Sequence, residues 1–151
     1  DFRAETFSNC FQACTSLRSL PRDLFARQTV AKDFSGCFIG CTGLTAIPEG
    51  LFDTASMATD FSGCFSGCTS LAAIPVGLFD KQHNATDFKF CFKGCDSLQG
   101  ETPYATVNGV RVKLWERDPA ANGYVKVKES TQCFAYATQL TDYGTIPGGW
   151  K

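Results

Sequence analysis

The chain is poor in the residue types from which catalytic sites are built. Its 151 residues contain a single histidine, His83, and a single methionine. His83 lies in a polar stretch, residues 81–84, and no nucleophile is placed beside it by any recognisable pattern. A Ser-His-Asp or Cys-His mechanism would have to use this residue, and no glycine-rich phosphate loop follows a strand-like run. The sequence therefore predicts a protein that is not an enzyme and has no cofactor.

Charge and long apolar runs are also scarce. Charged residues make up 19% of the chain, the net charge is −1 and no basic stripe appears, so nucleic acid is not an expected partner. No apolar run approaches the roughly 20 residues that a membrane-spanning helix needs, so direct membrane insertion is not expected. The chain begins at Asp1 inside a repeat-like pattern. We interpret it as a mature or trimmed chain, in which the lack of a signal peptide says nothing about compartment.

Tyrosine and tryptophan are missing from the first two thirds of the chain. All four Tyr and both Trp follow residue 103, whereas thirteen of the fourteen Phe precede residue 93. The first part is therefore predicted to form an apolar core, and the last part to be a region of amphipathic aromatic residues. The length fits one domain. We predict a single domain, 1–151, made of four repeats (1–98), an insertion (99–129) and a terminal capping repeat (130–151).

What the chain does have is a period of 27 residues. Four copies of the pattern F-x-x-C-F-x-x-C-x-x-L begin one period apart, and the first three continue with x-x-[LI]-P-x-x-L-F; they open at Thr6-Phe7, Asp33-Phe34, Asp60-Phe61 and Asp87-Phe88. A fixed period of this length indicates stacked units that bury their apolar faces against their neighbours. Such arrays usually present surfaces to partners.

Each copy reads as a short helix followed by a short strand. In the third copy, Phe61, Cys64, Phe65 and Cys68 stand at i, i+3, i+4 and i+7, which is one face of a helix. Leu71 to Ile74 then read as a strand that Pro75 ends. The expected fold class is an α/β repeat solenoid, a leucine-rich-repeat-like right-handed stack of helix-plus-strand units, with a small antiparallel β meander inserted before the terminal repeat.

The residues C-F-S-G-C-T-S-L-A-A-I-P, 64–75, resemble the A-F-x-x-C-x-x-L-x-x-I core of BspA-like leucine-rich repeats. The resemblance covers residues 6–98 well and residues 133–140 more loosely; Cys10, Cys37, Cys64 and Cys91 stand in place of the family's Ala. It implies a bacterial surface protein of the Bacteroides type with adhesion or host-contact roles. It also implies an extracytoplasmic location, at the cell surface or secreted.

The pattern breaks after Leu98 and resumes at Cys133-Phe134, 42 residues after Cys91-Phe92. We interpret the resumed copy as a degenerate cap. Between the two, Val107-Asn108-Gly109-Val110 is a strong signal for a type I′ hairpin. The alternation of apolar and polar residues predicts a three-stranded meander over roughly 104–107, 110–116 and 124–128.

The cysteines are the strongest chemical signal. Eight of the nine form four C-x-x-x-C pairs in phase with Phe, and Cys133 is the ninth. Residues at i and i+4 of a helix could share a metal, but zinc motifs favour C-x₂-C, and a disulfide across i and i+4 would distort the helix. We interpret them as small buried hydrophobes, with a metal or redox protein as an alternative. The periodic acids Asp33, Asp60 and Asp87 are expected to cap helices rather than to bind calcium.

Function is expected to lie in the C-terminal aromatic residues. Tyrosine, tryptophan and arginine are the usual anchors of protein interfaces, and their flat faces also suit sugars. We therefore predict a non-enzymatic interaction module that binds a host or bacterial surface protein or a glycan. The expected binding residues are Tyr104, Arg111, Trp115 and Tyr124. A structural spacer within a larger surface protein is a further alternative.

Overall fold

The computed structural model describes residues 3–151 and contains little regular secondary structure. Strands β1 (Tyr104–Val107) and β2 (Val110–Lys113) form one antiparallel sheet, and α1 (Pro119–Asn122) is the α-helix of the described chain. Three single-turn 3-10 helices complete the elements: η1 (Leu114–Glu116), η2 (Tyr143–Thr145) and η3 (Gly148–Trp150). The predicted leucine-rich-repeat-like solenoid of helix-plus-strand units is therefore wrong, and the structure gives no support to adhesion or secretion, which rested on that likeness.

Each predicted helix is instead a pair of four-residue turns. In the second copy, the Cys37 amide donates to the Phe34 carbonyl at 3.2 Å, and the Cys41 amide donates to the Phe38 carbonyl at 3.1 Å. The third residue of each turn has a positive φ, 58° at Gly36 and 71° at Gly40. This is the geometry of a type II turn. Two such turns return Phe and Cys to the same side at i, i+3, i+4 and i+7, which is the spacing that predicted a helix.

The predicted short strands are also absent from the described copies. Residues 71–74 are extended chain with no ladder. Their link to the preceding copy is a single backbone hydrogen bond, from the Ala72 amide to the Thr45 carbonyl at 3.1 Å. Pro75 removes one donor from this segment, so a continuous ladder cannot form there.

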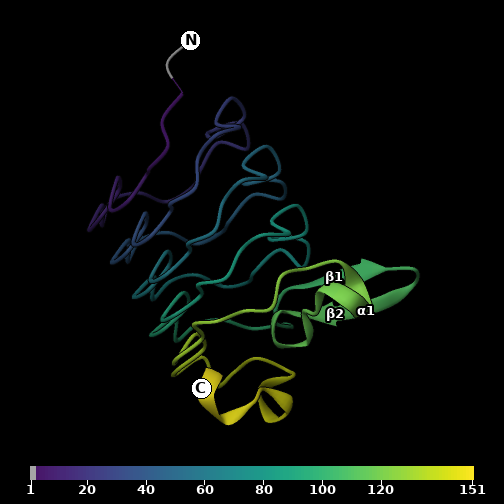
Figure 1. Ribbon diagram of the computed structural model, residues 1–151. Coiled ribbons are helices and arrows are strands. Elements are labelled where there is room, and N and C mark those ends of the chain that lie inside the picture. The colour runs from purple at the N-terminus through teal and green to yellow at the C-terminus, as the bar shows by residue number, and fades with distance from the viewer. Residues whose placement is uncertain (1–2) are drawn as a thin grey trace.

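Successive copies of the pattern lie one above another (Figure 1). Along the paired turns, amides of one copy donate to carbonyls of the next. Between the second and third copies these bonds measure 2.7–2.9 Å; they join Phe34 to Asp60, Gly36 to Ser62, Phe38 to Cys64 and Gly40 to Ser66. We call each such layer of turns a coil. The backbone polar groups of the turns are thus satisfied by neighbouring coils rather than within a helix.

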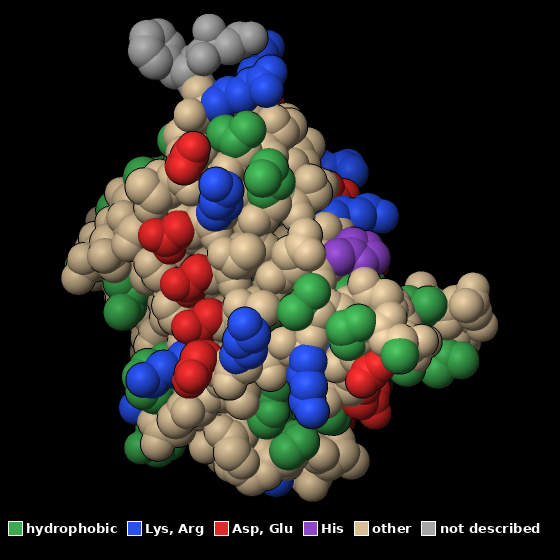
Figure 2. All heavy atoms as spheres, in the orientation of Figure 1, with side chains coloured by type: hydrophobic (Ala, Val, Ile, Leu, Met, Phe, Trp, Pro, Cys, Tyr) green, Lys and Arg blue, Asp and Glu red, His purple; other side chains and the backbone are tan. Residues whose placement is uncertain are grey.

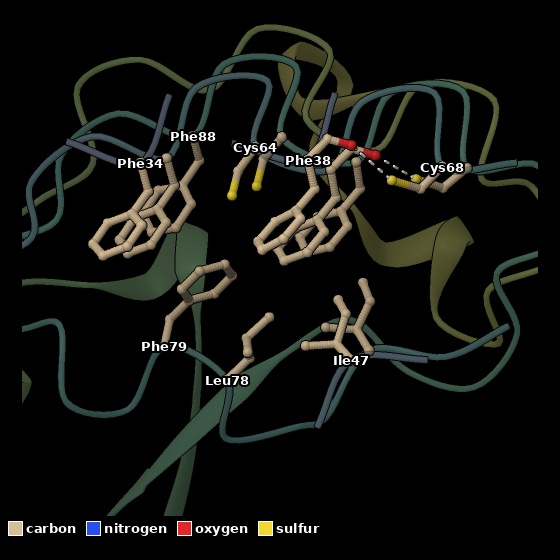
Figure 3. Packing of buried hydrophobic residues seen from close by; sticks show 14 of the residues in the cluster. Phe34, Phe38, Ile47, Cys64, Cys68, Leu78, Phe79 and Phe88 are labelled. Carbon is tan, nitrogen blue, oxygen red and sulfur yellow. Dashed lines mark hydrogen bonds between the residues drawn. The ribbon is translucent and has the colours of Figure 1, made fainter. Parts of the chain in front are cut away.

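The core is a set of aromatic columns that run along the stack (Figure 3). The rings of Phe38, Phe65 and Phe92 are nearly parallel, with centroids 5.3 and 5.5 Å apart. Phe79 meets the neighbouring column edge-on, 4.9 Å from Phe61. Offset and edge-to-face contacts of this kind add about 0.5–1.5 kcal/mol per pair to the burial of the rings. Buried Cys and Leu columns fill the space beside them.

The hairpin prediction is confirmed for its turn and first strand. β1 covers residues 104–107, and Asn108 and Gly109 have φ of 50° and 79°, as a type I′ turn requires. The second strand ends at Lys113 rather than 116, because Leu114 turns into η1. The third strand, 124–128, does not form. Its amides bond to a loop of the stack instead, Val125 to the His83 carbonyl and Lys128 to the Thr86 carbonyl, both at 2.9 Å.

Residues 130–140 form a fifth coil beneath the fourth. The Phe92 amide donates to the Cys133 carbonyl at 2.8 Å, although the two residues are 41 apart, because the insertion loops out of the stack. The final residues turn back under this coil. The amides of Gln132 and Phe134 donate to the carbonyls of Gly149 and Trp150 at 3.1 and 2.8 Å. The C-terminal end of the stack is therefore closed by η3.

Candidate binding surface

A buried arginine ties the insertion to the stack. Arg117 is 4% exposed, and its guanidinium donates to the carbonyls of Gln82 and Phe79, each at 2.9 Å. The guanidinium carbon lies 4.4 Å from the centre of the Tyr124 ring. Burial lowers the pKa of Arg117 to about 10, and the side chain stays charged at neutral pH. Its two hydrogen bonds and the aromatic contact compensate part of the cost of burying this charge.

Tyr124 is part of the same joint. Its ring is 3% exposed and stacks on His83, with centroids 4.4 Å apart and planes 3° from parallel. Its hydroxyl donates to the Asp80 carbonyl at 2.9 Å. Burial raises the pKa of this hydroxyl. Because the ring is covered, Tyr124 attaches the insertion to the stack and offers no open face to a ligand.

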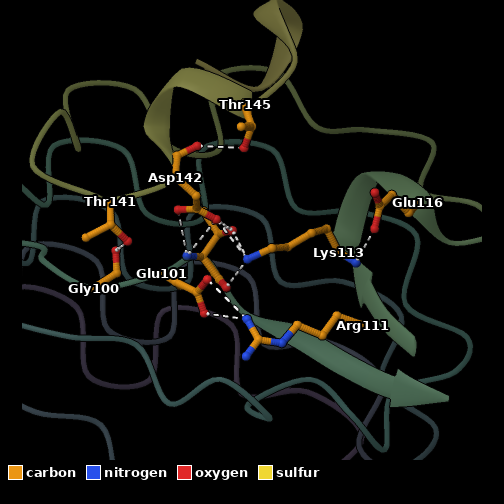
Figure 4. Close-up of polar contacts among 9 residues, drawn as sticks. Gly100, Glu101, Arg111, Lys113, Glu116, Thr141, Asp142 and Thr145 are labelled. Carbon is orange, nitrogen blue, oxygen red and sulfur yellow. Dashed lines mark hydrogen bonds and ion pairs between the residues drawn. The ribbon is translucent and has the colours of Figure 1, made fainter. Parts of the chain in front are cut away.

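A second polar joint links the hairpin to the C-terminal segment (Figure 4). The Lys113 ammonium lies 2.8 Å from Asp142 Oδ2 and 3.0 Å from the Thr102 carbonyl. The Thr102 amide donates to Asp142 Oδ1 at 3.0 Å, and the Thr102 hydroxyl donates to Oδ2. Burial alone would raise the pKa of Asp142, but hydrogen bonds from Lys113 and Thr102 outweigh it and lower the pKa. The carboxylate is thereby held in its charged form.

Trp115 belongs to the packing between η1 and the end of the chain. Its ring meets Trp150 edge-on, with centroids 5.8 Å apart and planes 70° apart. Trp150 in turn stacks against Phe134 of the fifth coil, 6.4 Å between centroids. Trp115 is partly buried against the core. Its ring therefore stabilises the closed end of the stack.

Tyr104 and Arg111 are the two expected binding residues that the structure brings together. Tyr104 pairs with Lys113 and Arg111 pairs with Thr106, so Tyr104 and Arg111 lie diagonally across the two strands. The Arg111 guanidinium carbon lies 4.6 Å from the Tyr104 ring centre. Lys113 Nζ lies 5.0 Å from the same ring. Arg111 also pairs with Glu101 at 3.2 Å, while its side chain remains 60% exposed. The charged tip of Arg111 is thus open to solvent, whereas the Tyr104 ring carries two cations.

A shallow groove of about 450 Å³ lies between the hairpin and α1. Its apolar lining consists of Val107, Val110, Val112 and Ala121, and the polar residues beside them include Arg111 and Glu116. Val110 is 64% exposed, the most exposed of the large apolar aliphatic side chains of residues 3–151. The sequence analysis did not identify Val110 and Ala121, because it considered aromatic anchors. The exposure of Val110 could have been predicted from its place directly after the Asn108-Gly109 turn, where no further strand can cover it.

The cysteines lie in two columns along the stack. Seven are buried, and Cys10 and Cys14 of the first coil are exposed. The buried thiols of the second column donate to carbonyls of the coil above, as Cys68 Sγ does to the Phe38 carbonyl at 3.3 Å. Burial raises the pKa of Cys68 to about 12 and that of Cys64 well above its usual range. Residues 3–151 contain no group of three His, Cys, Asp or Glu side chains placed to hold a metal ion.

The periodic acids cap turns rather than helices. Asp33 Oδ1 accepts from the Ser35 amide at 2.8 Å, and Asp60 and Asp87 repeat this contact in the next coils. Parallel bridges join these residues into a column that ends at Glu129, and Figure 2 shows acidic side chains following one another along one face. Burial, together with the charges of Asp60 and Glu129, raises the pKa of Asp87 against the hydrogen bond from the Lys89 amide.

Comparison with known proteins finds no matching family model and no matching curated protein. The resemblance to BspA-like repeats therefore stays a prediction. Among the described residues, no helix has both the length and the apolar character needed to cross a bilayer. The candidate site accordingly depends on its geometry alone: a shallow groove with an exposed valine and an exposed arginine, on a hairpin that two polar joints hold in place.

Proposed function

We propose that the protein is a non-enzymatic binding module whose partner is another protein, and that the groove between the hairpin and α1 receives an extended segment of that partner. The single observation that carries the proposal is the exposure of Val110, 64%, at the groove. The Val110 side chain is exposed to water on an ordered hairpin. Its burial by a partner would stabilise the complex by roughly 1.5 kcal/mol or more.

The hairpin is well suited to a role as a binding element. It projects from the stack (Figure 1), yet Arg117 holds its base through buried hydrogen bonds and Lys113 through a partly buried one. A partner would therefore meet a surface that is already ordered, and little conformational entropy would be lost on binding. The exposed Arg111 beside the groove can pair with a carboxylate of the partner.

The surroundings of the groove favour a protein over a glycan. Sugar sites commonly use an open aromatic face, but Tyr124 is covered by His83 and the Tyr104 ring carries Arg111 and Lys113. The groove itself is lined by aliphatic side chains. Apolar contacts with one arginine at the edge are typical of protein interfaces. An extracytoplasmic location and a partner from a host or bacterial surface remain predictions.

The test is a selection of phage-displayed random peptides on the purified protein. We expect enriched peptides that combine apolar residues with an Asp or Glu. Val110→Asp and Arg111→Ala should each weaken their binding by about tenfold or more, since each removes one of the few anchors. Met57→Asp is the matched control, because Met57 is also an exposed apolar residue, 46%, and does not line the groove.

A glycan array probed with the same protein separates the other class of ligand. Binding of glycans that Tyr136→Ala abolishes and Val110→Asp leaves unchanged would contradict the proposal, because Tyr136 is an exposed aromatic residue outside the groove, 65%. Enriched peptides that bind the Val110→Asp protein as tightly as the parent would contradict it as well.

A further inference from the structure

The contact between neighbouring coils is the same set of bonds each time. Four amides, spaced two residues apart, donate to four carbonyls of the following coil, as from Phe7, Asn9, Phe11 and Ala13 to Asp33, Ser35, Cys37 and Ile39. At three of the four contacts one thiol donates in the opposite direction, as Cys41 Sγ does to the Phe11 carbonyl at 3.1 Å. The phenyl columns continue through the same contact, with Phe11 5.2 Å from Phe38.

Among residues 3–151, nothing lies opposite one side of the first coil. By the 27-residue offset, the carbonyls that should accept belong to Thr6, Ser8, Cys10 and Gln12, and none of them receives a hydrogen bond within residues 3–151. The ends of the two phenyl columns, Phe7 and Phe11, are only partly buried, whereas their counterparts in the next coil are fully buried. Cys10 and Cys14 are exposed for the same reason.

The opposite end of the stack is closed by the chain itself. The fifth coil donates to the carbonyls of Gly149 and Trp150, and the Trp150 ring, 7% exposed, lies on Phe134. The two ends therefore differ in kind. One is covered by η3, and the other offers free acceptors beside an apolar surface.

A second copy of this chain does not match the open end. Two N-terminal ends brought face to face would set the carbonyls of Thr6 to Gln12 against the same carbonyls, and acceptors cannot bond to acceptors. Head-to-tail stacking is blocked because η3 occupies the C-terminal end. The occupant must bring four amides at two-residue spacing, together with two phenyl rings.

We propose that the N-terminal end of the stack is a docking surface for one further coil of the same 27-residue pattern. Such a coil carries the four amides and the two phenyl rings in the required positions, since the contacts among the first four coils are made in this way. Once docked, it covers Cys10 and Cys14 and continues the columns of Phe7 and Phe11.

The experiment inserts a second copy of residues 33–59 between Glu5 and Thr6 of the full chain. Both junctions then repeat natural ones, because Glu5 stands where Lys32 does and Thr6 stands where Asp60 does. Alkylation by iodoacetamide, mapped by mass spectrometry, should show Cys10 and Cys14 modified at least about tenfold more slowly than in the parent. The thiols of the inserted copy should take their place as the reactive ones.

The control carries the same insertion with Phe34→Ser and Phe38→Ser in the added copy only. Because this copy lacks the rings that continue the columns, Cys10 and Cys14 should react as fast as in the parent. Parental reactivity in the unmodified insertion would overturn the proposal. So would sedimentation of the parent as a dimer in which these two thiols are protected, because a second copy would then occupy the surface.

Discussion

The conformation of single residues decides the architecture of the coils. Each turn needs a positive φ at its third residue, and glycine supplies it at five such positions, among them Gly67 at 72°. Elsewhere a side chain adopts the same conformation; these residues are Asn9, Ala13, Phe90, Gln132 and Tyr136. A left-handed conformation costs a residue with a Cβ roughly 1–2 kcal/mol. The first, fourth and fifth coils therefore carry local strain that the second and third do not.

We expect Gly67→Ala to lower the free energy of unfolding by about 1–2 kcal/mol. A Cβ at this position would lie 3.7 Å from the nearest atoms of Gly40, an ordinary contact, so the cost comes from the backbone conformation rather than from a clash. Urea denaturation measures the change. Gly144→Ala is the control, because no atom lies within 4 Å of its added Cβ. An equal effect of the two substitutions would contradict this account.

The sequence predicts which residues are buried better than how the chain turns between them. The Phe, Cys and Leu columns follow from the period, since Phe61, Cys64 and Phe65 recur in phase and are all fully buried. A helix and a pair of four-residue turns both place these residues on one side. The glycine at every fourth residue, as at Gly63 and Gly67, distinguishes the two, because it marks positive φ. The spacing of Phe and Cys alone, without these glycines, therefore predicted a helix that does not form.

At the scale of elements, the hairpin turn was predictable from its own residues, whereas the predicted third strand was not formed. The Asn108-Gly109 turn was predictable because two consecutive positive φ values select that pair. The residues after Gly123 alternate like a strand, but their amides find carbonyls of a loop that lies far away in sequence, such as that of His83. Similarly, no local pattern tells that Trp115 and Tyr124 pack inward while Arg111 remains exposed.

The joint at Asp142 should make stability depend on acid pH. Its pKa is lowered in the folded state, so the stabilisation is fully present above the ordinary value of 3.8 and is lost as the pH falls through the lowered pKa. We expect Asp142→Asn to have a lower melting temperature than the parent protein at pH 7. Below pH 4, the melting temperatures of the two proteins should approach each other. Thermal denaturation between pH 2.5 and 7 measures this.

The matched control for Asp142 is Asp96→Asn, an exposed acid outside both joints. This variant should follow the parent at every pH. If Asp142→Asn instead kept a constant difference from the parent down to pH 2.5, its effect would not come from the charge of the carboxylate, and the role assigned to the Lys113 and Thr102 contacts would be wrong.

At the scale of the whole molecule, burial divides the thiols into two classes. Cys10 and Cys14 are exposed and the other seven are buried, with the pKa of Cys68 raised to about 12 by burial. A thiolate is the reactive form, so a buried thiol with a raised pKa reacts slowly. The exposure of a thiol follows from its position along the stack. Cys10 and Cys14 of the first coil are exposed, whereas the equivalent Cys37 and Cys41 of the second coil are buried.

We therefore expect Ellman's reagent at pH 8 to modify two thiols quickly in the native protein and nine in guanidinium chloride. The Cys10→Ser, Cys14→Ser double variant should show almost no fast reaction while keeping the melting temperature of the parent within a few degrees. Fast modification of more than two native thiols would contradict the buried columns. It would favour the alternative in which the cysteine pairs carry redox chemistry.

The asymmetry between the two ends of the stack has a mechanical consequence. Each coil is bonded to the coils next to it, and the first coil has a neighbour on one side only among residues 3–151. Tension applied from the N-terminal side is therefore resisted at the first coil only by its contact with the second coil, so the first coil would detach before the second is loaded. Each of the first three coils frees 27 residues of contour when it detaches, about 90 Å at full extension. Under load from the N-terminal side, the chain therefore lengthens in three equal steps before the fourth coil, which carries the insertion, gives a longer one.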